Sequence, residues 1–174
     1  MVEKALLEDV QDLVNLRMLL MKELGELNGS EKLFRKATEE YFTANINSPN
    51  NYTAILKVDG KVVSAGSIVF FIRPPSPGNL QGKEAYVMNM YTAFDHRKHG
   101  YSSAILKHLM QYGQKSGVNR IWLNASAAGK SLYQKHGFIE YDSEMEYVFE
   151  KIKVTKLLIE RGLKGQWFLK NKKN

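Results

Sequence analysis

Two strand-like runs around a two-residue turn limit the fold of this chain more than any other feature. Residues 52–58 (YTAILKV) and 61–72 (KVVSAGSIVFFI) are rich in β-branched and aromatic residues, and Asp59-Gly60 separates them. An Asp-Gly pair between two such runs is typical of a tight hairpin turn. The sequence therefore predicts an antiparallel strand pair, and with it a β-sheet.

Helical patterns come before this strand pair. Apolar residues recur at roughly helical spacing from Leu6 to Leu24, and Asn28-Gly29 supplies a stop signal. A second helix is predicted to begin at Ser30 as its N-cap and to end where residues 45–51 break the pattern.

Strands and helices alternate after the strand pair. Prolines in Arg73–Gly82 exclude a central strand there and predict a loop over one edge of the sheet, where it could line a site. The later elements are expected as follows: a strand over Glu84–Thr92, a helix over Gly100–Ser116, a strand over Arg120–Ala125, a short helix over Lys130–His136 and a closing hairpin over Phe138–Lys153 around Asp142-Ser143. This order predicts an α/β (α+β) domain over residues 1–153, with a basic extension over residues 154–174.

Composition narrows the function classes. The 174 residues, 44% of them hydrophobic, suit one domain with one core, and the absence of cysteine excludes disulfides and thiolate chemistry. The N-terminal residues MVEKALLEDV carry no readable targeting signal, and the longest apolar run, Ala65–Ile72, is too short to cross a membrane. We therefore expect a cytoplasmic protein without a membrane partner, and the sequence allows a homodimer.

A basic loop stands between a predicted strand and a predicted helix. In the segment DHRKHGYSSAIL, Arg97, Lys98, His99 and Gly100 precede the helix. The first backbone N–H groups of a helix lack intrahelical partners and lie at the positive end of its dipole, so a phosphate there accepts several hydrogen bonds. Gly100 allows close backbone approach, and Ser102 and Ser103 are small. The segment is a candidate anion site, although taken alone it also fits a solvated basic cluster.

Three blocks in order, VMNMYTAFDHRKHGYSSAIL, IWLNAS and AGKSLYQKHGF, resemble the GNAT (GCN5-related N-acetyltransferase) superfamily from the first helix to about Phe149. The loop is similar to the pyrophosphate motif Gln/Arg-x-x-Gly-x-Gly/Ala, with Ser102 in the last position. The resemblance implies a mixed, mostly antiparallel sheet flanked by helices, with central strands that splay apart. It also implies acetyl-CoA as co-substrate, with cofactor contacts from Met90, Tyr91, Thr92, Arg97, Lys98, His99, Gly100, Tyr101, Ser102 and Ser103.

Tyr133 is the candidate general acid that the resemblance implies. Its block, LYQKHGF, is similar to the family signature A-x-x-L-Y-x-K-x-G-F, with Gly129 where alanine is common. Amine attack on a thioester expels a thiolate, and a phenol can donate a proton as that charge develops. Asn124 and Ser126 match positions near the pantetheine arm, but Ser126 is equally suited to capping the next helix.

Other interpretations explain less of the chain. Gly129-Lys130-Ser131 lacks the first glycine of a P-loop, and Gly100–Ala104 lacks the second glycine of a nucleophile elbow. The four histidines form no metal-binding pattern, so we expect no metal. A non-catalytic acetyl-CoA sensor with the same fold stays open as an alternative. The net charge of +7 also keeps open a nucleic-acid-binding protein, although the scattered basic residues argue against nucleic acid.

The expected activity is transfer of an acetyl group from acetyl-CoA to a primary amine of a small molecule or peptide, by direct attack in a ternary complex. No motif identifies the acceptor or the base. Candidates that could attract or orient a cationic amine are Glu84, Asn89, Glu144 and Glu146.

Overall fold

A computed structural model describes residues 1–27 and 31–141 of the chain. The predicted stop at Asn28-Gly29, the N-cap at Ser30, most of the closing hairpin and the extension over residues 154–174 lie outside these described residues. Within the described ranges, no helix has the length and apolar character needed to span a membrane.

Within the described residues, a five-stranded mixed sheet forms the middle layer and confirms the predicted fold class. Its strands lie in chain order, with antiparallel pairing throughout except that the last two strands are parallel. The strands are β1 (Val2–Lys4), β2 (Asn51–Val58), β3 (Lys61–Ile72), β4 (Lys83–Thr92) and β5 (Arg120–Trp122). The predicted hairpin is confirmed as β2 and β3, whose turn places Asp59 and Gly60 at positive φ.

The N-terminal strand β1 was not predicted from the sequence. It has three residues and pairs with the edge of β2, with Val2 opposite Leu56 and Lys4 opposite Ala54. Three residues are too few to show alternation, so the strand depends on the partner edge rather than on a local pattern. The first helix consequently begins later than Leu6, after a 3-10 turn at Leu7–Asp9.

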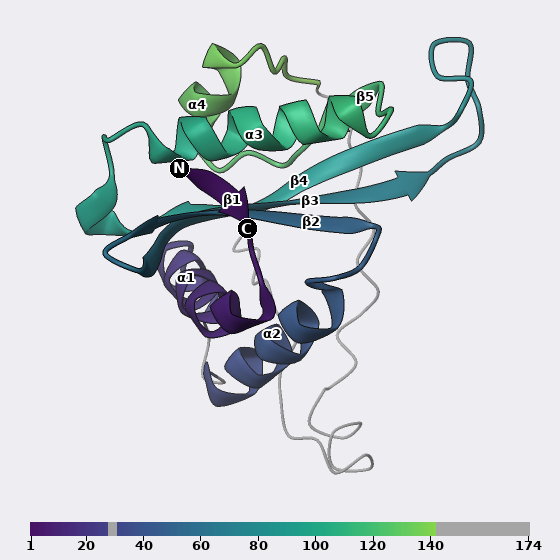
Figure 1. Ribbon diagram of the computed structural model, residues 1–174. Coiled ribbons are helices and arrows are strands. Elements are labelled where there is room, and N and C mark those ends of the chain that lie inside the picture. The colour runs from purple at the N-terminus through teal and green to yellow at the C-terminus, as the bar shows by residue number, and fades with distance from the viewer. Residues whose placement is uncertain (28–30, 142–174) are drawn as a thin grey trace, which may run out of the picture.

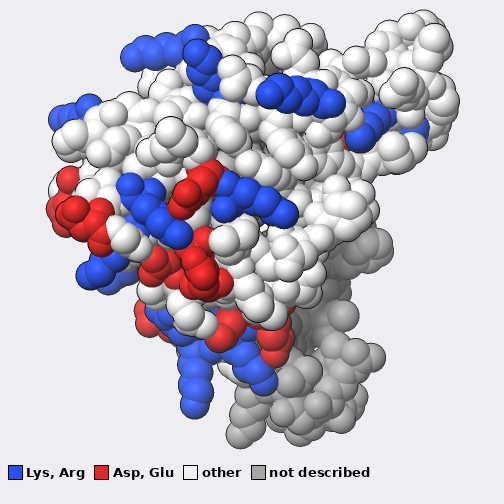
Figure 2. Space-filling model, viewed as in Figure 1, with Lys and Arg blue, Asp and Glu red and all other residues white. Residues whose placement is uncertain are grey.

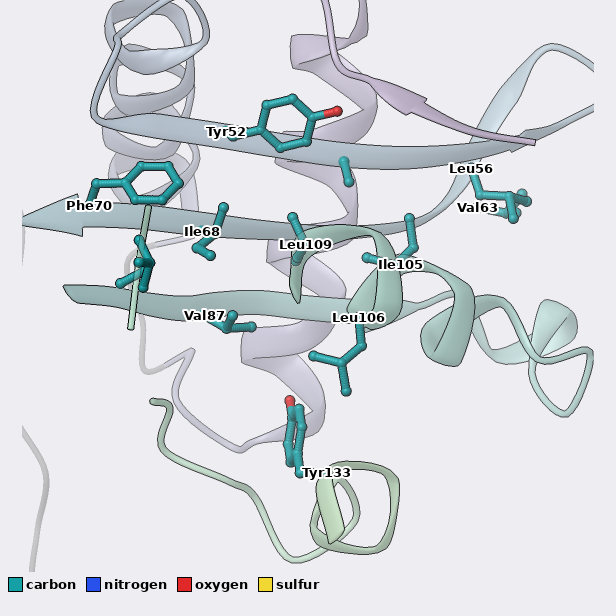
Figure 3. Packing of buried hydrophobic residues seen from close by; sticks show 13 residues of the cluster. Tyr52, Leu56, Val63, Ile68, Phe70, Val87, Ile105, Leu106, Leu109 and Tyr133 are labelled. Atoms are coloured by element: carbon teal, nitrogen blue, oxygen red, sulfur yellow. The ribbon is translucent and has the colours of Figure 1, made fainter. Parts of the chain in front are cut away.

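Helices cover both faces of the sheet (Figure 1). The α1 face carries the helices α1 (Val10–Glu23) and α2 (Glu31–Asn45), and the α3 face carries α3 (Tyr101–Lys115) and α4 (Lys130–Lys135). Two apolar clusters fill the spaces between the layers, one on each face. Figure 3 shows the cluster on the α3 face, where Ile105, Leu106 and Leu109 of α3 meet Ile68 and Val87 of the sheet.

An irregularity in β4 marks the centre of the sheet. Ala65 pairs with Tyr91 but Ser67 pairs with Met88, so β4 holds one more residue than β3 across this step. Asn89 lies at this bulge and has a positive φ of 55°. A side chain on Gly66, opposite this bulge, would collide with Met90, which explains the glycine there.

The strands β4 and β5 pair over a short stretch. Their register is Glu84 with Arg120, Ala85 with Ile121 and Tyr86 with Trp122, and it stops there. Among the described residues, β4 therefore has no strand on this edge from Val87 to Thr92. Backbone groups of β4 beyond Tyr86 are left available to pair with something other than a strand.

Candidate active site

The loop before α3 has the backbone form of an anion-binding turn. Lys98 and Gly100 both have positive φ, 65° and 77°, and Gly100 is the N-cap of α3. The first helical hydrogen bond runs from the Ala104 N–H to the Gly100 carbonyl at 3.0 Å. The N–H groups of the first turn therefore have no acceptor within the helix and, with the turn before them, can bind a diphosphate.

The Arg97 side chain does not extend freely from this loop. Its guanidinium donates two hydrogen bonds to the Glu23 carboxylate at the end of α1, at 3.0 and 2.5 Å, and its Nε donates to the Thr92 carbonyl at 3.1 Å. The Tyr91 hydroxyl donates to the same carboxylate at 3.1 Å. The Arg97 hydrogen bond lowers the pKa of Glu23, so this carboxylate stays charged. Arg97 thus ties the loop to the α1 face.

Ser102, the departure from the family motif, has a structural partner. Its hydroxyl lies 2.7 Å from the Thr92 hydroxyl, which in turn lies 2.7 Å from that of Ser64. This chain of three hydroxyls joins the first turn of α3 to β4 and β3. Nearby, the Ser103 hydroxyl lies 2.6 Å from His136 Nε2, and the rings of His99 and Tyr101 stack.

The last residues of β4 connect the loop with the bulge. Met90 packs on the α3 face and Tyr91 on the α1 face, directly after Asn89. The same stretch has no neighbouring strand on its β5 side among the described residues. Peptide groups of an extended ligand could pair with it as a strand would.

Tyr133 belongs to α4 and lies on the α3 face of the sheet. Its ring packs into the cluster on the α3 face and against Phe138, and 9% of its surface is exposed. Figure 3 shows the hydroxyl end directed from α4 toward β4 and Leu106. Burial, and then the nearby Tyr86, raises the pKa of Tyr133, and no described residue hydrogen-bonds its hydroxyl. The phenol therefore remains protonated at neutral pH and keeps its proton to donate.

Asn124 and Ser126 play different parts in the connection from β5 to α4. The Asn124 N–H donates to the Tyr86 hydroxyl at 3.3 Å, which places this backbone beside the end of the β4–β5 pairing. The Ser126 hydroxyl accepts from the Gly129 N–H at 3.3 Å, and its carbonyl accepts from the Lys130 N–H at 3.1 Å. Ser126 thus stabilises the turn before α4, but the N-cap of α4 is Gly129, which has no side-chain cap bond, so the expected capping of the helix by Ser126 is wrong.

Gly129 stands where the family signature has alanine, and the structure gives a reason. A Cβ on Gly129 would lie 3.0 Å from Tyr133 Cε2 and 3.3 Å from Ser126 Oγ. Alanine would press on the tyrosine ring, so the glycine lets Tyr133 sit close to the turn.

A hollow on the α1 face lies across β4 from the loop that precedes α3. Its cavity volume is about 10 Å³, room for about one water molecule, and its lining includes the bulge residue Asn89, Tyr91 and Arg17 of α1. Its other walls come from α1, α2 and β3: Leu13, Leu16, Leu20, Phe42, Ala65 and Ser67. Reasoning from the sequence missed Arg17. The signal available in the sequence was a basic residue among the apolar residues of this helix, because Arg17 lies between Leu16 and Leu20, with Leu13 one turn earlier.

The carboxylates considered as partners for a cationic amine fall elsewhere. Glu84 is buried at the far end of β4, where Arg73 and Arg120 approach its carboxylate at 3.3 and 3.6 Å. Glu144 and Glu146 lie outside the described residues. Asn89 alone of the four candidates reaches the hollow. The Arg73–Gly82 loop is at the opposite end of β3 and β4 from the Gly100 turn (Figure 1).

Solved structures with the same fold include several acetyltransferases. A predicted acetyltransferase from Clostridium acetobutylicum, solved with acetyl-CoA, has a TM-score of 0.78 and 24% identity, over 92% of this chain and 97% of that one. A GCN5-related N-acetyltransferase from Ralstonia eutropha JMP134 has a TM-score of 0.76 and 17% identity, over 85% of this chain and 97% of that one.

A more distant structure is named by its acceptor. Glucosamine-6-phosphate N-acetyltransferase from Arabidopsis thaliana has a TM-score of 0.64 and 18% identity, over 86% of this chain and 98% of that one. Among curated proteins, none matches significantly.

The sequence itself matches the model of the acetyltransferase (GNAT) family over residues 16–138. This range extends from α1 through the loop at Gly100 to the end of the Tyr133 block and spans well over half of the chain. The chain belongs to the acetyltransferase (GNAT) family.

Proposed function

We propose that this chain is an acetyl-CoA-dependent N-acetyltransferase that acetylates a primary amine by direct attack in a ternary complex. The observation that carries the proposal is the backbone at Gly100. A left-handed N-cap and the first turn of α3 offer unpaired N–H groups where a diphosphate would be held. The Clostridium acetobutylicum structure, which has the same fold, was solved with acetyl-CoA.

A cofactor held at Gly100 has a path to Tyr133. The β4 edge from Val87 to Thr92 has no strand partner among the described residues, so it can receive the amide groups of a pantetheine arm. Tyr133 lies on the same face of the sheet. We propose that the loop, the β4 edge and Tyr133 bind the cofactor together.

Acetyl-CoA supplies an acetyl group on a thioester. We propose that the neutral Tyr133 phenol donates its proton to the departing sulfur as the new C–N bond forms and the C–S bond breaks. Its raised pKa supports this role, because the acid form predominates at neutral pH. The ammonium proton of the acceptor leaves to solvent before attack, and the second proton that the nitrogen loses as the amide forms passes through solvent to restore the Tyr133 phenol. We propose that the bulge at Asn89 turns β4 backbone groups toward the reacting carbonyl.

Charge on the surface agrees with a small-molecule or peptide acceptor better than with nucleic acid. On the face shown in Figure 2, lysine and arginine side chains are separated by uncharged and acidic ones, and Asp and Glu gather over the α1 and α2 layer. A nucleic-acid site would need a continuous basic stripe.

The test compares binding and turnover. Calorimetry with CoA, dephospho-CoA and pantetheine should show tight binding for the first two and a large loss for pantetheine, which lacks the diphosphate. Thiol release from acetyl-CoA with a panel of amines should then show turnover. Binding with no turnover on any amine would indicate a sensor, and equal binding of pantetheine would refute the diphosphate site.

A further inference from the structure

Arg17 is a cation held inside an apolar wall. It extends from α1 into the hollow beside Asn89, and it is the only charged residue among the described residues that form this hollow. Burial lowers its pKa, while Glu26 and Tyr41 act in the opposite direction. A guanidinium keeps its charge under these conditions, so the α1 face places a positive charge next to the bulge.

No acid in the described part of the chain neutralises Arg17 directly. No carboxylate oxygen there lies within 4.0 Å of its guanidinium, and no hydrogen bond to a described residue engages it. Glu26 acts on it only at longer range. The other acid of this region, Glu23, is already held by Arg97 and Tyr91. Five N–H donors with no acceptor within residues 1–27 and 31–141 make a binding group for a carboxylate or phosphate.

The position of Arg17 relates this charge to the transfer site. Met90 of β4 packs on the α3 face, whereas Asn89 and Tyr91 line the hollow on the α1 face. A group bound by Arg17 would therefore sit across β4 from the loop at Gly100. The hollow has a cavity volume of about 10 Å³, room for about one water molecule, far below the roughly 300–1,000 Å³ of pockets that enclose whole drug-sized ligands. It can therefore meet only the tip of an anionic end group, and the rest of the acceptor would lie outside it.

We propose that Arg17 binds an anionic group of the acceptor, so that the acceptor is an amine carrying a carboxylate or a phosphate close to its amino group. This inference depends on the acetyltransfer proposed above. A cation beside the amine also favours its neutral, nucleophilic form, because like charges disfavour the ammonium.

The experiment uses matched pairs of amines that differ in one charge. Glycine and β-alanine are compared with their primary amides, and O-phosphoethanolamine with ethanolamine, by thiol release from acetyl-CoA. The wild-type protein should have a kcat/KM at least tenfold higher for the anionic member of one pair. The pair that shows this preference distinguishes a carboxylate from a phosphate. In Arg17→Met the preference should fall by about 10- to 100-fold, the range of a charge-assisted hydrogen bond.

Two further variants distinguish the loss of the Arg17 charge from a general effect on folding. Arg17→Lys should keep part of the preference. Arg35→Met should keep all of it, because Arg35 of α2 binds the Asn15 side chain at 2.8 Å on the same layer but outside the hollow. Turnover of neutral amines by the wild type with no preference for anionic ones overturns the Arg17 assignment and leaves the acetyltransfer intact. An unchanged preference in Arg17→Met overturns it as well.

If no amine in the panel turns over, the same pairs are titrated by calorimetry in the presence of CoA. Binding of an anionic member that Arg17→Met weakens supports the assignment without any catalysis. Failure of every anionic member to bind overturns it. A failure of CoA itself to bind would instead count against the proposed function.

Discussion

The two faces of the sheet differ in how their functional residues are assembled. On the α3 face, the turn at Gly100 and the first turn of α3 come from one continuous segment, and Tyr133 follows on the next helix. On the α1 face, the hollow combines Arg17 of α1, Phe42 of α2, Ser67 of β3 and Asn89 of β4. A local segment builds the first region, and tertiary packing builds the second.

This difference indicates how the two regions can vary. On the α3 face, the proposed cofactor site consists mainly of backbone groups, namely the left-handed residues Lys98 and Gly100 and the N–H groups of the first turn of α3. Side chains dominate on the α1 face, where one cation sits among apolar residues. A substitution should therefore alter cofactor handling on the α3 face mainly through backbone shape or through Tyr133, and acceptor choice on the α1 face through side-chain chemistry.

The largest effect is expected for Tyr133→Phe. Loss of the phenolic proton should lower kcat by about 100-fold, within the range for general acid catalysis, with little change in the Kd for CoA. Because burial raises the pKa of Tyr133, the wild-type enzyme should lose activity only at high pH, where the phenol ionises. The measurement is a pH profile of kcat for both proteins.

Tyr141, an exposed tyrosine, provides the control, since Tyr141→Phe should leave the profile unchanged. A Tyr133→Phe protein that keeps wild-type kcat at all pH values would show that the α3 face supplies binding but no acid.

The second prediction concerns the backbone at Gly100. No atom lies within 4 Å of a Cβ built there, so the cost of Gly100→Ala comes from its φ of 77° and not from collision inside the empty site. We expect about tenfold weaker CoA binding, since a left-handed conformation costs a residue with a Cβ about 1–2 kcal/mol. Gly100→Val should weaken binding further by crowding the diphosphate. Calorimetry with CoA measures both.

Gly60 offers a matched control in the hairpin turn. It has a φ of 76° and also has no atom within 4 Å of a Cβ position. Gly60→Ala should lose similar stability with no change in CoA binding. Equal CoA binding by Gly100→Ala and Gly60→Ala would show that Gly100 is not part of the CoA-binding site.

The sequence predicted the hairpin, the strand after it and the helices that follow because each depends on residues close in the chain, whereas anion binding by the turn at Gly100 stays a prediction. The Asp-Gly hairpin and the strand over Glu84–Thr92 are confirmed almost residue for residue. The strand over Arg120–Ala125 proved shorter, ending at Trp122, where its pairing with β4 stops. That end depends on where the two strands separate, which no local pattern contains.

The α1 face could not be predicted in the same way. Arg17 looks like an ordinary helix residue until packing places it in a hollow beside Asn89. The bulge at Asn89 could not be predicted from the sequence either, because only the pairing register of β4 with β3 reveals the extra residue. Arg97 was expected at the diphosphate, and the structure places its side chain on Glu23, 74 positions away in the chain. The contribution of its backbone remains a prediction.

A smaller effect is expected for Ser102→Ala. It removes one hydroxyl from the Ser64–Thr92–Ser102 chain, while Thr92 keeps its bond to Ser64. The free energy of unfolding should fall by about 0.5–1.5 kcal/mol, the usual net value of one hydrogen bond. CoA affinity should stay within about twofold, because backbone N–H groups hold the ligand. Urea unfolding and calorimetry test the two statements, and a large loss of CoA affinity would assign binding to the side chain.

The smallest effect should come from the contact that joins the two faces, Glu23 with Arg97. Both side chains are partly exposed, so Glu23→Gln should cost less than about 1 kcal/mol of stability. The Glu23 pKa is lowered in the folded state, so the stabilisation is present at neutral pH and is lost as pH falls through that pKa. Wild type and Glu23→Gln should therefore differ at pH 7 and converge in acid, as urea unfolding at several pH values can show.

Glu40→Gln is the control for this comparison, because Glu40 forms an exposed ion pair with Lys36 on α2, away from the loop. If the Glu23 contact couples the faces, Glu23→Gln should change the KM for the acceptor and the Kd for CoA together, by up to about threefold each, as expected when less than 1 kcal/mol is shared between two sites. Glu40→Gln should change neither. Movement of only one constant in Glu23→Gln would show that the α1 and α3 faces act independently, with Arg97 serving the stability of its loop alone.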